Sequence, residues 1–142
     1  MRPESNLGGL LGKSSRLLSN HFNSDLTSLG LTVEQWTLLA VLWDKDSQKQ
    51  KELQAALLKD KATINSLVGY LLKNGFVSKE RDHIDRRSFI ITLTPKGKKM
   101  QAQTIPLAMR NIGLATEGIT PENLEVTVKV LTQIINNLTK EK

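Results

Sequence analysis

Residues 60–75 read DKATINSLVGYLLKNG and carry the clearest helical pattern of the chain. Four apolar side chains recur at the i, i+3, i+4, i+7 spacing of one buried helix face, namely Ile64, Leu67, Val68 and Leu71. Asp60 is a favourable N-cap, and Gly75 suits the residue that follows a helix end. The stretch therefore predicts a helix over residues 61–74.

The opposite face of this helix is small and polar. At about 100° per residue it holds Ala62, Ser66, Gly69 and Lys73, flanked by Asn65 and Tyr70. In a helix-turn-helix, the N-terminal half of the second helix reaches base edges in the major groove, and here that half contains Lys61, Ala62, Thr63, Asn65 and Ser66. Asparagine can bind adenine through two hydrogen bonds, and serine and threonine can bind bases or phosphates. The alternative is an ordinary solvated face, because helix pairs are common connectors.

The apolar period then changes from 3.6 to 2 over two predicted strands, residues 76–81 and 88–93. Between them, the polar residues 82–87 form a hairpin tip that ends in Arg86 and Arg87. A protruding ribbon with arginine can enter the minor groove, and Asp85 could orient one guanidinium through paired hydrogen bonds. The alternative is a solvated turn with a weak surface ion pair. Further basic residues around the tip favour the DNA interpretation, namely Lys79, Arg81, Lys96, Lys98 and Lys99.

Apolar repeats predict further helices on both sides of this region. They cover about residues 5–29, 32–43, 49–58, 95–116 and 121–138. Thr32 and Gln35 form a capping-box pattern at the start of the second helix, and Pro106 should bend or interrupt the fourth. The last helix carries an apolar seam for another helix at Leu124, Val128, Leu131, Ile135 and Leu138. The polar residues 44–50 are a candidate hinge.

The charge of the chain is concentrated in its middle. The 142 residues suffice for one domain, and 20 basic against 14 acidic residues give a net charge of +6. Between Lys45 and Lys99 lie 13 of the basic and 6 of the acidic residues, so the excess charge belongs to the predicted helix and hairpin. A basic surface concentrated in this way suits a polyanion such as DNA.

Residue types that the sequence lacks exclude several classes of protein. No cysteine is present, which excludes disulfides, thiolate metal sites and sensing through thiol oxidation. Apolar runs are far shorter than the roughly 20 residues of a membrane span, and no secretory leader is recognisable, so we expect a cytoplasmic protein without a membrane partner. His21 and His83 have no local metal-ligand spacing, and no catalytic triad or carboxylate pair can be assembled. We therefore expect neither an enzyme nor a metal or cofactor.

Several segments keep a characteristic order and spacing over about residues 31–97. They are residues 31–36, residues 60–71, Asn74-Gly75-Phe76-Val77, Asp85-Arg86-Arg87 and Leu93-Thr94-Pro95-Lys96-Gly97. Together they resemble the MarR family of bacterial winged helix-turn-helix regulators. The most specific feature is the Asp-Arg-Arg wing followed at this distance by Leu-Thr-x-x-Gly.

This resemblance implies one domain over residues 1–142, mainly α with a small β-hairpin. A winged helix-turn-helix would span about residues 31–97, and dimerisation helices would span residues 5–30 and 95–140. The implied function is sequence-specific binding of double-stranded DNA by a homodimer on a pseudo-palindromic operator. The implied output is repression that a small anionic or aromatic effector relieves.

The same resemblance assigns roles to individual residues. Arg87 would be the wing arginine, held by Asp85. Gly69 and Tyr70 stand where the family often has an acidic and a basic residue, so Tyr70 would replace a phosphate contact, and Ser66 stands where a basic residue is frequent. The complete set of predicted DNA-binding residues is Lys61, Ala62, Thr63, Asn65, Ser66, Tyr70, Lys73, Asp85, Arg86 and Arg87.

Two alternatives stay open. An effector pocket would be lined by residues such as His21, Phe22, Trp36 and Trp43, although aromatic residues more often fill a core. A winged helix can also serve as a protein–protein adaptor without specific DNA binding, because a fold does not fix a function.

Overall fold

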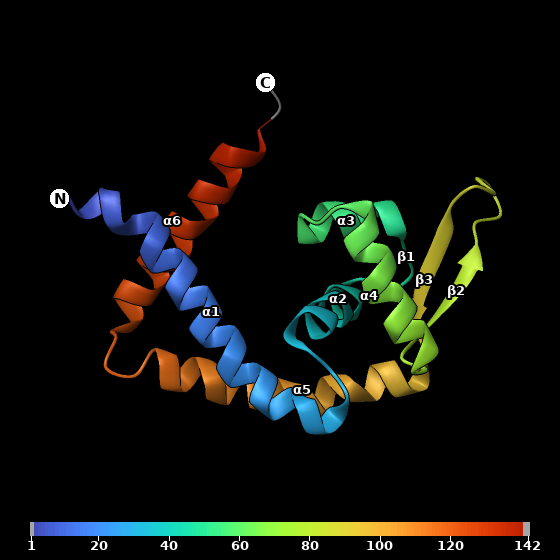
Figure 1. The fold of residues 1–142 in the computed structure, drawn as a ribbon, viewed down its shortest axis with the longest axis horizontal. Coiled ribbons are helices and arrows are strands. Elements are labelled where there is room, and N and C mark those ends of the chain that lie inside the picture. Colours follow the sequence, from blue (N-terminus) through green and yellow to red (C-terminus); the bar gives the residue numbers. More distant parts are fainter. Residues whose placement is uncertain (1, 141–142) are drawn as a thin grey trace.

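Six α-helices and one antiparallel sheet make up residues 2–140, the part of the chain that the computed structural model describes (Figure 1). The helices are α1 (Leu7–Leu26), α2 (Val33–Asp44), α3 (Gln50–Leu57), α4 (Lys61–Lys73), α5 (Pro95–Ala115) and α6 (Pro121–Thr139). The strands are β1 (Gln48–Lys49), β2 (Val77–Arg81) and β3 (Phe89–Leu93). Short 3-10 turns at Pro3–Asn6 and Thr27–Leu29 flank α1. The predicted class, mainly α with a small β element, is confirmed.

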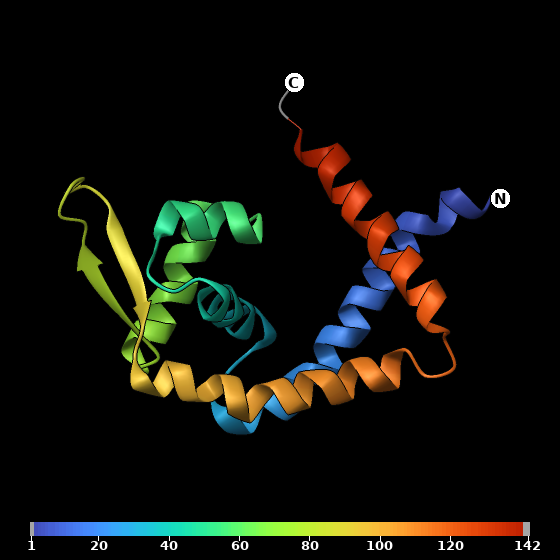
Figure 2. The ribbon, with the colours of Figure 1, turned by 180° about the vertical axis from the view of Figure 1, so that it is seen from behind.

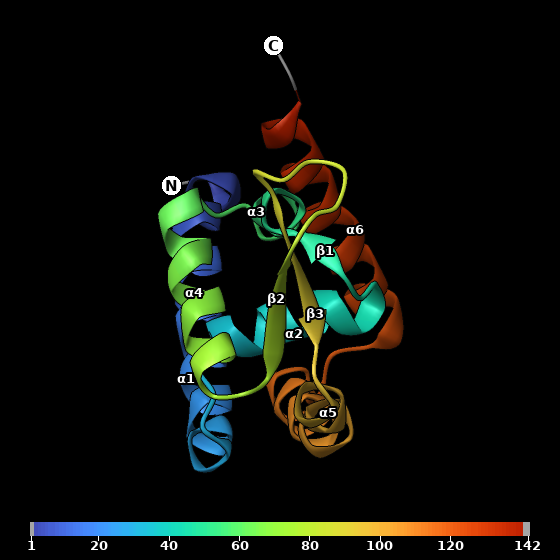
Figure 3. The same ribbon diagram turned by 90° about the vertical axis from the view of Figure 1, so that its right-hand side faces the viewer.

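The elements form two regions that α5 connects. The helices α2, α3 and α4 and the sheet gather at the N-terminal end of α5, whereas α6 and the first half of α1 lie toward its other end (Figures 1 and 2). The second half of α1 packs along α5. In the end-on view, β2 and β3 stand beside α4 (Figure 3).

Capping side chains begin α2 and α4 at the predicted residues. Thr32 Oγ1 accepts the Gln35 N–H at 3.2 Å, and the Thr32 N–H donates to Gln35 Oε1 at 2.9 Å, which completes the capping box. Asp60 Oδ1 accepts the Thr63 N–H at 2.8 Å. Gly75 follows α4 with a φ of 78°, a conformation that a side chain would disfavour.

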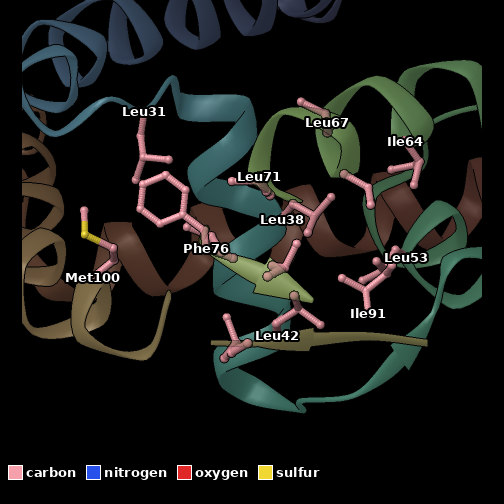
Figure 4. Close-up of a cluster of buried hydrophobic side chains, with 14 of the residues drawn as sticks. Leu31, Leu38, Leu42, Leu53, Ile64, Leu67, Leu71, Phe76, Ile91 and Met100 are labelled. Atoms are coloured by element: carbon pink, nitrogen blue, oxygen red, sulfur yellow. The ribbon is translucent and has the colours of Figure 1, made fainter. Parts of the chain in front are cut away.

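The apolar stripe of α4 is buried against α2 and the sheet (Figure 4). Ile64 and Leu71 of α4 are fully buried, as are Leu38 of α2, Leu53 of α3 and Ile91 of β3. Removing these side chains from water supplies the main stabilisation of this region. It also leaves the opposite, polar face of α4 in solvent.

A third strand lies in the stretch that was expected to be a hinge. Residues Gln48 and Lys49 pair antiparallel with Ile91 and Ile90 of β3, so the sheet has the order β1-β3-β2. Asp46 Oδ1 accepts the Leu93 N–H at 2.9 Å, which joins the segment to β3. The hinge prediction was wrong because residues 48–49 pair with β3 and the side chains of Asp46 and Ser47 bond to residues of the same strand.

The helix α5 continues through Pro106, so the predicted interruption does not occur. Proline lacks an N–H and therefore leaves the carbonyl four residues earlier without its helical partner. Ala102, the residue in question, is exposed, as is Pro106, so water can bind that carbonyl. The predicted first helix, in contrast, is divided, since α1 ends at Leu26 and a 3-10 turn follows.

The first turn of α5 docks against the start of the sheet at Gly97. This buried glycine lies so close to Phe76 that an added Cβ would be 2.1 Å from the Phe76 carbonyl oxygen and 3.2 Å from Leu93 Cδ2. Its carbonyl accepts the Trp43 Nε1–H at 3.0 Å, which ties α2 to the same point. A backbone atom cannot move aside as a flexible side chain can, so only glycine fits.

We predict that Gly97→Ala lowers the free energy of unfolding by about 3 kcal/mol, because the new methyl group overlaps backbone. Urea unfolding followed by circular dichroism at a fixed protein concentration measures this loss. The matched control is Gly69→Ala, since Gly69 lies in α4 with no atom near its added Cβ. The control should raise stability by up to about 1 kcal/mol through helix propensity. Equal effects of the two variants would contradict the steric explanation.

Candidate nucleic-acid interface

The helices α3 and α4 form a pair joined by the three residues 58–60. Leu58 adopts a left-handed φ of 53°, and the Lys59 N–H donates to the Gln54 carbonyl at 3.1 Å. These two features end α3 and turn the chain within three residues, after which Asp60 caps α4. The pair has the order expected for a helix-turn-helix, with α4 as its second helix.

Most of the predicted DNA-binding residues of α4 lie on its exposed face. They are Lys61, Ala62, Asn65, Ser66 and Lys73, and Gly69 lies among them. Thr63 is half-buried, and its N–H is used by the Asp60 cap. Tyr70 is also half-buried, and its hydroxyl donates to the Gly30 carbonyl at the end of the first helical segment. The Tyr70 hydroxyl therefore already has a partner within the protein.

Gln50, at the start of α3, is a candidate that the sequence reasoning missed. Its Nε2 donates to Oδ1 of Asn65, across the space between the two helices of the pair. Each amide has both donor and acceptor groups, which is the chemistry that reads base edges. The only sign of this role in the sequence is that Gln50 is a polar residue at the start of a predicted helix. No local spacing relates Gln50 to Asn65.

The hairpin between β2 and β3 forms the wing and contains the predicted Asp85–Arg87 pair. The Arg87 N–H donates to Asp85 Oδ1 at 3.1 Å, and Arg87 Nε lies 3.5 Å from the same oxygen. Ser88 Oγ donates to the second carboxylate oxygen at 3.0 Å. The Arg87 N–H, followed by the Ser88 hydroxyl, lowers the pKa of Asp85. The Arg86 side chain is exposed, as is that of Arg87.

A second carboxylate, which the sequence reasoning did not single out, joins the wing to the helix pair. Asp82 is buried at the base of the hairpin tip, and its Oδ2 lies 3.2 Å from Nζ of Lys49, the residue of β1 that directly precedes α3. Its Oδ1 accepts the Ile84 N–H at 3.1 Å. The Ile84 N–H, followed by the Lys49 side chain, lowers the pKa of Asp82.

A hollow of about 430 Å³ lies between the helix pair and the wing. Among the described residues its lining includes five cationic side chains and no carboxylate, the cations being Lys49, Lys51, Lys61, Lys79 and Arg87. Lys79 also lies 4.5 Å from the centre of the Phe89 ring, which lines the same hollow. The hollow thus brings Lys61, Asn65 and Arg87 together, whereas Lys73 and Arg86 lie outside its lining.

A smaller, apolar hollow of about 180 Å³ lies between α1, α2 and α5. Of the four residues proposed for an effector pocket, Phe22 and Trp36 line it. Trp43 and His21 are outside the lining. Trp43 packs edge-on against Trp36, and its Nε1–H donates to the Gly97 carbonyl, whereas His21 is exposed. The Trp36 Nε1–H donates to Thr104 Oγ1 at 2.7 Å, so this ring also ties α2 to α5.

The capped helix pair, the wing beside it and the cation-lined hollow between them define a winged helix-turn-helix protein of the nucleic-acid-binding class. The family model described as "Transcriptional regulator SarA/Rot" matches residues 21–103, more than half of the chain. The chain belongs to the MarR family of winged helix-turn-helix transcriptional regulators. The resemblance to this family is thereby confirmed.

Individual relatives cover most of the chain. The "Organic hydroperoxide resistance transcriptional regulator" of Bacillus subtilis (strain 168) is 25% identical over 118 residues, which are 83% of this chain and 80% of the relative. A MarR protein structure from Peptoclostridium difficile DA00132 superposes with a TM-score of 0.89 at 27% identity, covering 94% of this chain and 87% of that one. The structure of a MarR transcriptional regulator from Methanosarcina mazei Go1 superposes with a TM-score of 0.85 at 25% identity. The match covers 94% of this chain and 97% of that one. These relatives are transcriptional regulators, not enzymes.

Two further observations concern residues 2–140 alone. Within them no helix is both long and apolar enough to cross a membrane. In the same part of the chain, no group of three or more His, Asp or Glu side chains is placed to hold a metal ion.

We predict that Asp82→Asn makes stability less dependent on pH in acid. A carboxyl whose pKa is lowered by folding contributes stability that is complete above the pKa of the unfolded chain and is lost as pH falls through the folded pKa. Wild-type protein should therefore lose stability below about pH 5 more steeply than the variant. Urea unfolding between pH 7 and pH 3 measures both slopes. The control is Glu80→Gln, which removes an exposed carboxylate of β2. If the unfolding free energy of Asp82→Asn fell with pH as steeply as that of wild type, the role of the Asp82 carboxylate would be refuted.

Proposed function

We propose that this chain is a sequence-specific regulator that binds double-stranded DNA with α4 in the major groove and the wing in the minor groove. The observation that carries the proposal is the hollow between these two elements, because within residues 2–140 its lining unites five cations without a carboxylate. Lysine and arginine side chains arranged in this way bind phosphates, which position the protein on the duplex.

The N-terminal half of α4 supplies the base-reading and phosphate-binding groups of this proposal. Lys61 stands in the first turn, where a positive charge opposes the helix dipole and costs stability. A nearby phosphate would offset that cost. Asn65 and Ser66 are exposed one turn further on and would face base edges, with Ala62 and Thr63 beside them. Lys73 would bind backbone phosphate at the other end of the helix.

The wing supplies the minor-groove contacts of the proposal. Arg87 would enter the groove with its guanidinium oriented by Asp85, and Arg86 would bind a flanking phosphate. Tyr70 would support DNA binding by positioning α4, since its hydroxyl donates to the Gly30 carbonyl in the segment before α2.

The regulator we propose acts as a homodimer within a single domain of residues 1–142. No side chain of α6 is buried, yet α6 carries Val128, Ile135 and Leu138 with exposed fractions of 63%, 50% and 81%. Apolar surface of this extent on a helix indicates an interface. Residues 5–30 and 95–140 would form the dimer, and residues 31–97 of each copy would bind one half-site of a pseudo-palindromic operator.

Repression relieved by a small molecule completes the proposal. The apolar hollow at Phe22 and Trp36 lies between the helices of the dimer region and α2. Its volume of about 180 Å³ is below the range of roughly 300–1,000 Å³ for drug-sized ligands, so it suits an effector of about one ring. An effector there would change how α1 and α5 hold the DNA-binding region.

We predict that Arg87→Ala weakens DNA binding and reduces its salt dependence. Loss of one cation near the phosphates should reduce the magnitude of the slope of log binding constant against log salt concentration by about 0.9. Fluorescence anisotropy with a duplex selected by the wild-type protein from a random pool measures both quantities. Lys129→Ala is the control, because Lys129 lies on α6 in an ion pair with Glu125 at 3.2 Å.

The same titrations separate this regulator from a protein–protein adaptor. An adaptor would select no duplex over random DNA at about 150 mM salt, and its weak binding would not change with Arg87→Ala. Either result would overturn the proposal.

We also predict that Val128→Asp combined with Ile135→Asp converts a dimer into a monomer. Burying two carboxylates in an apolar seam carries a large desolvation cost. Sedimentation velocity should show two copies for wild type and one for the variant. Asn136→Asp adds an exposed charge to the same helix and should leave the dimer intact. A monomeric wild-type protein would refute the proposed assembly.

A further inference from the structure

The tip of the wing carries the most exposed large apolar side chain among residues 2–140. Ile84 is 96% exposed, more than any other large hydrophobic residue described. The hairpin projects at the end of the sheet that lies away from α5 (Figures 1 and 2). Single apolar residues on a surface are common, but this one stands at the end of an arginine-bearing ribbon.

The backbone around Ile84 is fixed by hydrogen bonds. The Ile84 N–H donates to the buried Asp82 carboxylate, and the Ser88 N–H donates to the Asp85 carbonyl at 3.0 Å. The Asp82 N–H closes the base of the loop on the Ser88 carbonyl at 2.9 Å. The side chain of Ile84 is therefore held outward by an ordered loop, so contact with a partner requires little further ordering.

The charges around Ile84 identify the class of its partner. Arg86 and Arg87 follow it in the same loop, and Lys79 and Arg81 lie on the adjoining strand. A surface that docks another protein would need a contiguous apolar patch. One apolar residue among cations instead suits a polyanion whose binding groove also offers apolar surface. The DNA minor groove meets this description, since apolar side chains including isoleucine are used there.

We infer that Ile84 is a specificity-determining residue that contacts the minor groove and disfavours G·C pairs beneath the wing. This inference rests on the proposed DNA-binding function. The guanine N2 amino group projects into the minor groove, whereas A·T pairs present only acceptors there. An isoleucine above the guanine amino group would remove water from that donor without replacing the hydrogen bond, which is unfavourable.

The test uses the full chain and a duplex selected by the wild-type protein from a random pool. Hydroxyl-radical footprinting locates the base pairs under the wing, and three duplexes then carry A·T, G·C or inosine·C at those positions. Inosine lacks the N2 amino group, so it isolates the contact that Ile84 is inferred to disfavour. The protein variants are Ile84→Asn, Ile84→Val and Arg86→Ala, all at exposed positions.

Wild-type protein should bind the A·T and inosine duplexes alike and the G·C duplex about tenfold more weakly. Ile84→Asn should lose about tenfold affinity for the A·T duplex, bind all three duplexes alike and keep the wild-type salt slope, because an apolar contact releases no counterions. Ile84→Val should retain the preference. Arg86→Ala should keep the preference against G·C and reduce the dependence of affinity on salt concentration.

The outcomes also separate the inference from the function on which it rests. If wild-type protein selects no duplex, the regulatory function itself fails. If selection succeeds but Ile84→Asn keeps the preference against G·C, or inosine behaves like guanine, only the role of Ile84 is overturned. Unchanged affinity of Ile84→Asn for every duplex would likewise overturn it.

Discussion

Burial of one side of α4 is the constraint on which the proposed DNA-binding surface depends. Ile64 and Leu71 are fully buried and Val68 nearly so, in a helix that packs against α2, α3 and β2. Because a helix is rigid, fixing this stripe also fixes the direction of the opposite face, where Asn65 and Ser66 stand. The buried apolar residues of α4 thus position the polar residues that we propose to contact DNA.

The wing depends on a second set of contacts, which are polar. Lys49 belongs to β1, pairs with Asp82 at the hairpin and directly precedes α3, so one residue links the sheet, the wing and the helix pair. The ion pair costs less here than in a dry core, because the Lys49 side chain stays 44% exposed. This ion pair joins the wing to the helix pair, although the cations that line the hollow between them repel one another.

Sequence reasoning predicted the elements that have a regular apolar period or a strong cap. It placed α4 to within one residue at its end, and it found both strands of the wing and the Asp85–Arg87 pair. It missed β1, the Gln50–Asn65 bond and the Asp82–Lys49 pair, which join residues far apart in the chain. Polar residues in a short segment look alike whether they bind water or a distant backbone group, so no local pattern distinguishes a hinge from an edge strand.

The two exposed surfaces of the chain differ in chemistry, and α5 determines how they are related. One is apolar and lies on α6, and the other is cationic and lies on the wing and helix pair. Trp36 and Trp43 bond α2 to α5, and Asp25 of α1 bonds to Arg110 at 3.1 Å and Asn111 at 2.8 Å of the same helix. A rearrangement of α1 against α5 would thus be carried to α2 and onward to α4. In a dimer built on α6, such a shift would alter the spacing of two α4 helices, which a duplex with half-sites about 34–36 Å apart tolerates poorly.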